Sequence, residues 1–221
     1  MDDNLTDQQR AEQVRGWFGA NFWFLLAGLV LGLGALFGWR QWTAERTQNA
    51  EQASALYEEM LTAIRIGRSV RAEEIAGELE RDYTATPYLD QARLAMARLK
   101  LDSSLPEEAA RYLEQVVDGR ASAELRDIAR LRLARVLIQM EKYEEAIKQL
   151  APPQDSAFAS RYHEVRGDAY YAMGRRDDAR SEYQAALEQV AESPIDPALL
   201  QAKLDEVGGA AAPATTAATA P

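Results

Sequence analysis

Two stretches of the sequence align without a gap: LRLARVLIQMEKYEEAIKQL at residues 131–150 and EVRGDAYYAMGRRDDARSEY at residues 164–183, an offset of 33 residues. Small residues coincide with small ones, as at Ala134 over Gly167, and large apolar residues coincide with large ones. A third copy, LAMARLKLDSSLPEEAARYL at residues 94–113, keeps the pattern at an offset of 37 residues. A gapless match of this length, with small and large positions in register, is typical of a structural repeat.

Apolar residues follow a helical period throughout residues 43–207. Leu56, Met60 and Ile64 form one stripe at four-residue steps, and no segment alternates with period two. This spacing predicts amphipathic helices. Glycine, proline and polar pairs interrupt the pattern often enough to imply helices of about 12–20 residues joined by short turns. The expected breaks are Gly67, Thr86-Pro87, Ser103–Pro106, Asp118-Gly119, Glu141-Lys142, Pro152-Pro153, Gly174 and Pro194.

Helix pairs repeated at this spacing are typical of the tetratricopeptide repeat, whose period is about 34 residues. One pair cannot bury its apolar face alone, so consecutive pairs stack into a solenoid. The predicted fold is therefore all-α, with a solenoid of antiparallel helix pairs over residues 43–207; a generic helical bundle with chance similarity is the alternative. We expect an atypical first pair near residues 51–82 and a capping helix over residues 194–207, with Asp196 as its N-cap.

A long uncharged segment precedes the repeats. Residues 16–39 carry no charge, and FWFLLAGLVLGLGALFGW at residues 22–39 is continuously apolar or glycine. About 20 such residues cross a bilayer as a helix, so we predict a single N-terminal transmembrane helix over residues 16–42. A cleaved signal peptide is disfavoured, because the run is too long and lacks small residues at its end. Tryptophans flank the run at positions suited to the two membrane interfaces: Trp17, Trp23, Trp39 and Trp42.

Glycines within this segment are spaced for helix packing. Gly28 with Gly32, and Gly34 with Gly38, form two small-xxx-small pairs that would let partner helices approach closely, although glycine is also simply common in transmembrane helices. The orientation is not decided by charge, because two arginines lie near each end of the segment. A short head is easily left in the cytoplasm, which favours a translocated C-terminal domain.

The ends and the composition restrict the function. We expect disorder in the head at residues 1–15 and in the Ala/Thr/Pro tail at residues 208–221. The net charge of −10, from 25 basic and 35 acidic residues, argues against a nucleic-acid partner. The chain has no cysteine, a single histidine (His163), and no phosphate-loop, zinc-protease or serine-hydrolase motif. We therefore expect a non-enzymatic protein with no catalytic residue, cofactor or metal.

A candidate binding groove follows from the repeat. The first helix of each pair is expected to line the concave face of such a solenoid. Residues one and four positions after the small residue of that helix would point into the concavity. A mixed set of cation, amide, anion and aromatic groups can hold an unfolded segment without demanding one sequence, although the same residues can simply be solvated. The predicted groove residues are Arg98, Arg135, Gln139, Asp168 and Tyr171.

The segment LGLGALFGWRQW at residues 31–42, followed by repeats carrying LRLARVLIQ and RGDAYYAMG, resembles the YfgM family. Members of that family are ancillary subunits of the bacterial SecYEG translocon. The resemblance covers roughly residues 10–205. It implies a single-pass inner-membrane protein with a cytoplasmic N-terminus and a periplasmic tetratricopeptide-like domain. It also implies partners: the SecYEG translocon, a periplasmic chaperone of the PpiD type, and unfolded secretory polypeptides that are passed to periplasmic chaperones.

Two other functions stay open from the sequence. The repeats occur on unrelated proteins, so the chain could be a scaffold for another cell-envelope assembly complex. An enzyme is disfavoured by the missing motifs. The sequence does not indicate the oligomeric state, the range of clients or which surface binds which partner.

Overall fold

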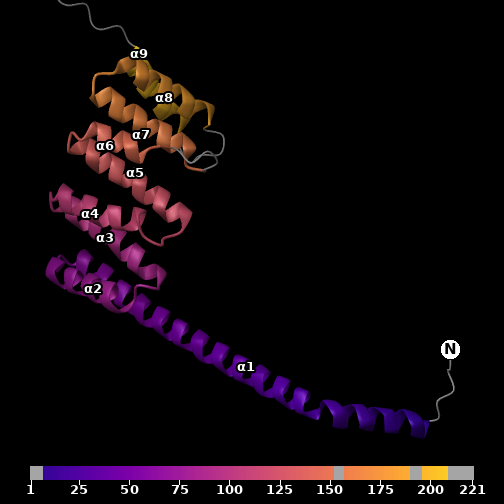
Figure 1. Cartoon of the computed structure of the whole chain (residues 1–221). Coiled ribbons are helices and arrows are strands. Elements are labelled where there is room, and N and C mark those ends of the chain that lie inside the picture. Colours follow the sequence, from indigo (N-terminus) through magenta and orange to yellow (C-terminus); the bar gives the residue numbers. More distant parts are fainter. Residues whose placement is uncertain (1–6, 152–156, 190–195, 209–221) are drawn as a thin grey trace, which may run out of the picture. The chain divides into compact units, whose positions relative to one another are not determined.

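The computed structural model describes residues 7–151, 157–189 and 196–208, and within these ranges it contains helices and turns but no strand (Figure 1). The all-α prediction is confirmed. The helices are α1 (Asp7–Arg65), α2 (Ser69–Asp82), α3 (Pro87–Asp102), α4 (Pro106–Val117), α5 (Ala123–Gln139), α6 (Tyr143–Gln149), α7 (Ala159–Ala172), α8 (Arg176–Glu188) and α9 (Pro197–Gly208). The expected breaks in the described ranges fall between helices, with Pro87 and Pro106 as the first residues of α3 and α4; Pro152-Pro153 and Pro194 lie outside the described residues.

The chain divides into two compact units, residues 1–52 and residues 53–221. Helix α1 contributes to both, because it runs without a break from Asp7 to Arg65. The prediction of a disordered head is wrong for residues 7–15, which are helical. The physical reason is that Gln, Arg, Ala and Glu favour the helix, and a helix already nucleated by the apolar segment extends at low cost. Residues 1–6 and 209–221 lie outside the described residues.

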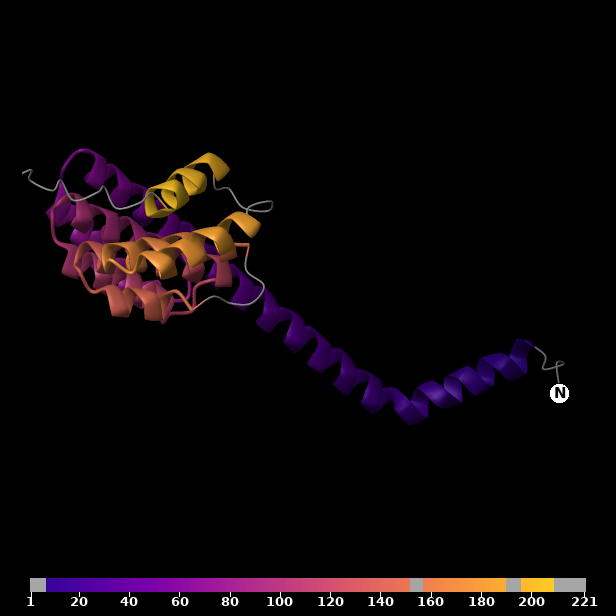
Figure 2. The same ribbon diagram turned by 90° about the horizontal axis from the view of Figure 1, so that it is seen from above.

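In the second unit, α2 to α9 follow one another along the stack in chain order (Figure 1), and Figure 2 shows the same helices from above, overlapping in projection. Each helix from α2 to α9 packs on its neighbours in sequence, and α5 also packs on α7. One buried cluster joins the end of α1 with α2 and α3, and a larger one runs from α3 through α7. The apolar faces are thus buried between consecutive pairs, as expected for a solenoid whose repeats cannot fold singly.

The inner seam of each pair combines one small and one large residue at fixed repeat positions. The pairs are Ala97 with Leu113, Ala134 with Leu150, and Gly167 with Tyr183. All five of the residues with side chains are buried. The sizes compensate, because the smallest residue faces the largest: a Cβ added to Gly167 would lie only 2.5 Å from a ring carbon of Tyr183. The small–large register predicted from the sequence therefore describes the actual helix crossings.

The turn inside each helix pair has one backbone geometry. The residues in the left-handed region are Gly67, Ser104, Glu141 and Gly174, with φ of 74°, 59°, 61° and 75°. At each turn this residue donates its N–H three residues back, and the next residue donates five back, as in Arg68 N–H to Ala63 C=O at 2.8 Å. This is the Schellman arrangement, which satisfies carbonyls left free at a helix end. The pair formed by α1 and α2 shares it, so this atypical pair is a true repeat in its backbone.

The C-terminal cap also forms as predicted. The Ala198 N–H donates to the Asp196 carboxylate at 2.9 Å, and Pro197 is the first residue of α9. Proline suits this position, because the first helical N–H has no intrahelical partner in any case. Gly208, which the sequence placed in the tail, is the last residue of α9.

Replacing Ala134 by leucine is expected to lower the free energy of unfolding by about 1–2 kcal/mol. Ala134 is fully buried in the large cluster, so the added carbons overpack the seam. The cost stays moderate because α6, against which α5 packs, has only 7 residues and can shift outward. Urea unfolding of the full chain in detergent, followed by circular dichroism, measures the change. An Ala134→Leu midpoint equal to that of the original chain would contradict the repeat register.

Candidate functional site

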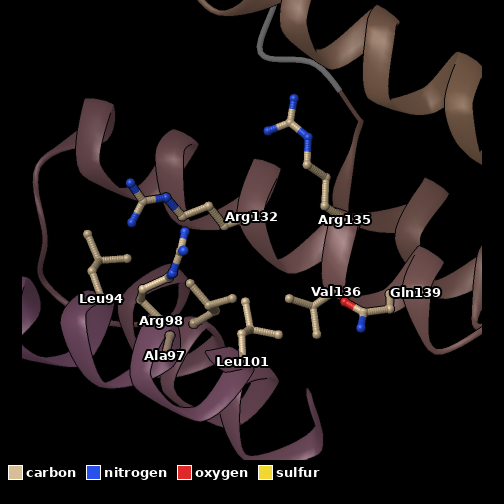
Figure 3. A pocket seen from close by; sticks show the side chains of 9 residues that line it. Leu94, Ala97, Arg98, Leu101, Arg132, Arg135, Val136 and Gln139 are labelled. Atoms are coloured by element: carbon tan, nitrogen blue, oxygen red, sulfur yellow. The ribbon is translucent and has the colours of Figure 1, made fainter. Parts of the chain in front are cut away.

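Three of the predicted groove residues line one pocket of about 320 Å³. Arg98 comes from α3, and Arg135 and Gln139 come from α5, the first helices of consecutive pairs (Figure 3). Leu113 of α4 also lines the pocket. The complete lining is Leu94, Ala97, Arg98, Leu101, Leu113, Arg132, Arg135, Val136 and Gln139.

Arg132 also lines this pocket, and the repeat-position count missed it. Arg132 lies one helical turn before Arg135 and therefore on the same face of α5. Counting one helical turn back from Arg135, three residues along the same face, would have found it. Three arginine side chains thus line the pocket together with five apolar residues.

The other two predicted residues, Asp168 and Tyr171, contact the chain's own last helix. Lys203 of α9 donates to both carboxylate oxygens of Asp168, at 2.7 and 2.9 Å. The Tyr171 hydroxyl donates to Glu206 of α9 at 2.7 Å. The structure therefore brings Arg98, Arg135 and Gln139 together and places Asp168 and Tyr171 against α9. The acidic spacing on α7 and the Lys203–Glu206 spacing on α9 were the available signals for this contact.

Glu164 is the most buried carboxylate at this contact, with 3% of the residue exposed. It accepts hydrogen bonds from Lys203 at 3.0 Å and from Arg161 at 2.8 Å. Burial alone would raise the pKa of Glu164, but these two cations outweigh it and hold the pKa below its ordinary value. The Tyr183 hydroxyl donates to Asp168 at 2.8 Å, and burial, followed by the nearby Asp168 charge, raises the pKa of Tyr183.

Replacing Lys203 by methionine is expected to destabilise the α7–α9 contact by about 1–2 kcal/mol at neutral pH. Methionine keeps an apolar stem but donates no hydrogen bond, so Glu164 and Asp168 each lose a cation. Because the pKa of Glu164 is lowered in the folded state, its contribution exists above its unfolded pKa of about 4.3 and is lost as pH falls through the folded value.

The deficit of the Lys203→Met chain relative to the original chain should therefore shrink as pH falls below the unfolded pKa of about 4.3 and through the lower folded value. Lys148→Met is the matched control, since Lys148 is exposed on α6. A deficit that does not shrink anywhere below about pH 4.3, or an equal deficit in the control, would contradict this account.

The tryptophan side chains of the apolar segment are not buried by the rest of their unit. Trp17, Trp23, Trp39 and Trp42 are all exposed. Near the predicted exit, the Arg46 guanidinium lies 3.8 Å from the centre of the Trp42 ring, and the Trp39 and Trp42 rings are 5.4 Å apart. A cation over an aromatic ring is a stable arrangement at a wet interface. Among the described residues, one helix is long and apolar enough to cross a membrane, and it is this apolar part of α1.

The four glycines of this helix border open space. A Cβ built on Gly28, Gly32, Gly34 or Gly38 would meet no atom within 4 Å outside the local helix. Nothing in the described chain covers them, so a role in contacting another helix stays a prediction.

The described residues contain no group of three or more His, Cys, Asp or Glu side chains arranged to hold a metal ion. His163 contacts Glu182, with 2.8 Å between Nδ1 and the carboxylate, and Arg166 donates to the same carboxylate at 2.7 Å. These contacts place His163 in an ion-pair cluster between α7 and α8.

A family model described as a tetratricopeptide repeat-like domain matches residues 15–209, which include the apolar helix and all the repeats. The chain is 32% identical, over 200 residues, to the "Ancillary SecYEG translocon subunit" of Escherichia coli (strain K12); the match covers 89% of this chain and 92% of that relative. The chain belongs to this family. The resemblance to it inferred from the sequence is confirmed.

Other members also match over more than nine tenths of both chains. The ancillary SecYEG translocon subunit of Neisseria gonorrhoeae (strain ATCC 700825 / FA 1090) is 26% identical over 208 residues, covering 94% of this chain and all of that relative. The one from Haemophilus influenzae (strain ATCC 51907 / DSM 11121 / KW20 / Rd) is 24% identical over 208 residues, covering 92% of this chain and 98% of its own length. The family likeness thus includes both the apolar helix and the repeats.

Proposed function

We propose that this chain is an ancillary subunit of the SecYEG translocon and acts there as a non-catalytic adaptor. The observation that carries the proposal is the match to the ancillary SecYEG translocon subunit of Escherichia coli across about nine tenths of both chains. The tetratricopeptide repeat-like architecture supports an adaptor, because stacked helix pairs expose extended surfaces suited to protein contacts.

The apolar part of α1 anchors the chain in the bacterial inner membrane. Residues 1–15 lie in the cytoplasm and the repeat domain lies in the periplasm. The continuous apolar run and the tryptophans at its ends support the span, and the short head supports the orientation. The open glycine faces on Gly28/Gly32 and Gly34/Gly38 offer close contact to translocon helices.

The repeat domain receives secretory polypeptides as they emerge unfolded and passes them to periplasmic chaperones, including a membrane-anchored partner of the PpiD type. A pocket with cations over an apolar floor supports contact with extended segments. Affinity for any one client is modest, because ordering an unfolded segment opposes binding. Weak binding suits a transfer step, in which the client must leave again.

Photo-crosslinking tests this function in native membranes. A crosslinkable residue introduced in place of Leu29, and another in place of Gln139, should capture translocon subunits and a periplasmic chaperone respectively. Both positions are exposed within their own units. Capture of components of a different envelope complex from both positions, with no translocon subunit, would replace this proposal by the scaffold function.

The orientation is tested separately by reporter fusions. Alkaline phosphatase fused after Gly67, in the turn between α1 and α2, is expected to be active, because that enzyme folds only outside the cytoplasm. A fluorescent protein that matures only in the cytoplasm should stay dark at the same position. The reverse pattern would place the repeat domain in the cytoplasm and exclude the transfer step proposed above.

A further inference from the structure

Three arginines gather in one pocket of a strongly acidic protein. Arg98 on α3 and Arg132 on α5 extend into the space between the two helices, and Arg135 points away from them (Figure 3), with its guanidinium 3.8 Å from Glu164 of α7. The chain as a whole carries 35 acidic and 25 basic residues, yet no Asp or Glu lines this pocket. The pocket is therefore positively charged, whereas the net charge of the chain is negative.

The described residues neutralise these arginines only weakly. Arg98 pairs with Asp102 at 2.9 Å, but both side chains are largely exposed, where ion pairs contribute little. Arg135 lies 3.8 Å from Glu164, which already accepts closer bonds from Arg161 and Lys203. Arg132 forms no salt bridge within the described part of the chain. The guanidinium groups of Arg132 and Arg135 are therefore available for an incoming anion.

The floor of the pocket is apolar and closely packed. Leu113, Ala97 and Val136 are buried, and Leu94 and Leu101 complete the apolar lining. The volume of about 320 Å³ is at the lower end of the range for ligand sites. A cavity of this size takes one large apolar side chain from a longer segment, with the charged rim left to contact the flanking residues.

The last repeat shows what the same repeat position can bind. Arg98, Arg135 and Asp168 occupy one repeat position, at offsets of 37 and 33 residues. At the last of these, Lys203 of α9 bonds to Asp168 with opposite charge, and Val207 of the same helix is buried in a cluster with Tyr183. The α7–α8 pair thus holds a helix by one charge pair and apolar contacts. The same position on α3 and α5 carries the opposite charge.

From these contacts we propose that the pocket between α3 and α5 binds an acidic segment of a partner polypeptide. One large apolar side chain of the segment enters the pocket, and the carboxylates on either side of it in the segment's sequence contact the arginines. Guanidinium groups bind carboxylates through two parallel hydrogen bonds, which selects Asp or Glu on the segment. The apolar floor selects a polypeptide over a simple anion such as phosphate, which would leave that floor unfilled. The proposal rests on the adaptor function above and names the chemistry of the segment that the adaptor recognises.

The test uses the full chain in detergent micelles and a short fluorescent peptide in which one leucine is flanked on each side by two glutamates. Fluorescence anisotropy measures its Kd. Two further peptides carry glutamines in place of the glutamates, or a serine in place of the leucine. We expect each of these to bind at least about ten-fold more weakly, and we expect added salt to weaken the acidic peptide, because its contacts are ionic.

The matched variants are Arg132→Ala/Arg135→Ala and the control Arg111→Ala/Arg120→Ala, which removes the same charge from exposed positions outside the pocket. The first is expected to weaken the acidic peptide about ten-fold or more, and the control less than two-fold. Should the double variant fail to fold by circular dichroism, Arg132→Gln alone serves, because Arg132 is exposed and forms no salt bridge that folding would lose.

Equal binding of the glutamine peptide, or unchanged binding by the folded variant, would overturn the proposal. Equal binding of the serine peptide would also overturn it, since the pocket would then be a general anion site. Failure of the adaptor function is seen in the photo-crosslinking experiment. There, the chain with a crosslinkable residue in place of Leu29, and no other change, would capture no translocon subunit in native membranes. The peptide experiment needs no translocon, so the two failures are distinguishable.

Discussion

Replacing Tyr162 by alanine is expected to lower the free energy of unfolding of the repeat domain by about 3–5 kcal/mol, the usual cost of truncating a buried aromatic side chain. Tyr162 lies in the first turn of α7 and is fully buried, with Val165, in the cluster that α7 shares with α3 to α6. The truncation would leave a cavity where two repeats meet, and the helices on either side are held by their own pairs and can collapse only partly.

The hydroxyl of Tyr162 adds a second interaction across the same boundary. It donates to the Asp127 carboxylate of α5 at 2.9 Å, and Arg130 bonds to the same oxygen at 3.2 Å. Burial, followed by the bond to Asp127, raises the pKa of Tyr162 to about 12, so the tyrosine stays neutral and donates throughout the accessible pH range. Tyr162→Phe keeps the ring and should cost about 1–3 kcal/mol, because the charged Asp127 carboxylate loses one of its hydrogen-bond donors.

Urea unfolding of the full chain in detergent separates these contributions. Tyr171→Ala is the control, because Tyr171 is partly exposed and its truncation should cost less than about 1 kcal/mol. If Tyr162→Ala were no more damaging than Tyr171→Ala, the packing between the third and fourth helix pairs would not be as described.

Gly167→Ala is expected to destabilise the domain by about 1–3 kcal/mol, although alanine is the better helix former. The new Cβ would lie 2.5 and 2.7 Å from two ring carbons of Tyr183, and the ring cannot move away freely because it is buried and its hydroxyl is bonded to Asp168. The clash therefore exceeds the gain of about 1 kcal/mol from helix propensity.

The same substitution should reverse its sign when Tyr183 is leucine. The double variant Gly167→Ala/Tyr183→Leu recreates the combination of Ala134 and Leu150 in the preceding repeat. In that background Gly167→Ala is expected to be neutral or to stabilise by up to about 1 kcal/mol, giving a coupling energy of about 2–3 kcal/mol between the two positions. A double-mutant cycle on urea midpoints measures it, and additive effects would show that the two residues do not meet.

The fold was predictable because its information is local and repeated. Helix ends follow from Gly67, Gly174 and the prolines, and the small–large register at Ala134 and Gly167 places the crossings. The effect of a substitution at Gly167 was less accessible. Helix propensity favours alanine there, and only the tertiary approach of the Tyr183 ring decides the sign.

The candidate site was predictable in part for the same reason. Counting along the repeat found Arg98, Arg135 and Gln139, which share a face of consecutive helices. It did not reveal that α9 contacts Asp168 and Tyr171, because the direction in which a terminal helix folds back depends on long-range pairing. The helical order of residues 7–15 was missed because composition was judged without the adjoining helix that nucleates it.

The common turn geometry has a consequence for how such a domain grows. Each turn at Gly67, Ser104, Glu141 and Gly174 is closed by its own main-chain bonds, whether glycine, serine or glutamate occupies the left-handed position. A duplicated copy of one helix pair would carry its own closure with it and need no compensating change elsewhere. The length of the surface that contacts other proteins is therefore set by the number of helix pairs, and gene duplication can extend it one pair at a time.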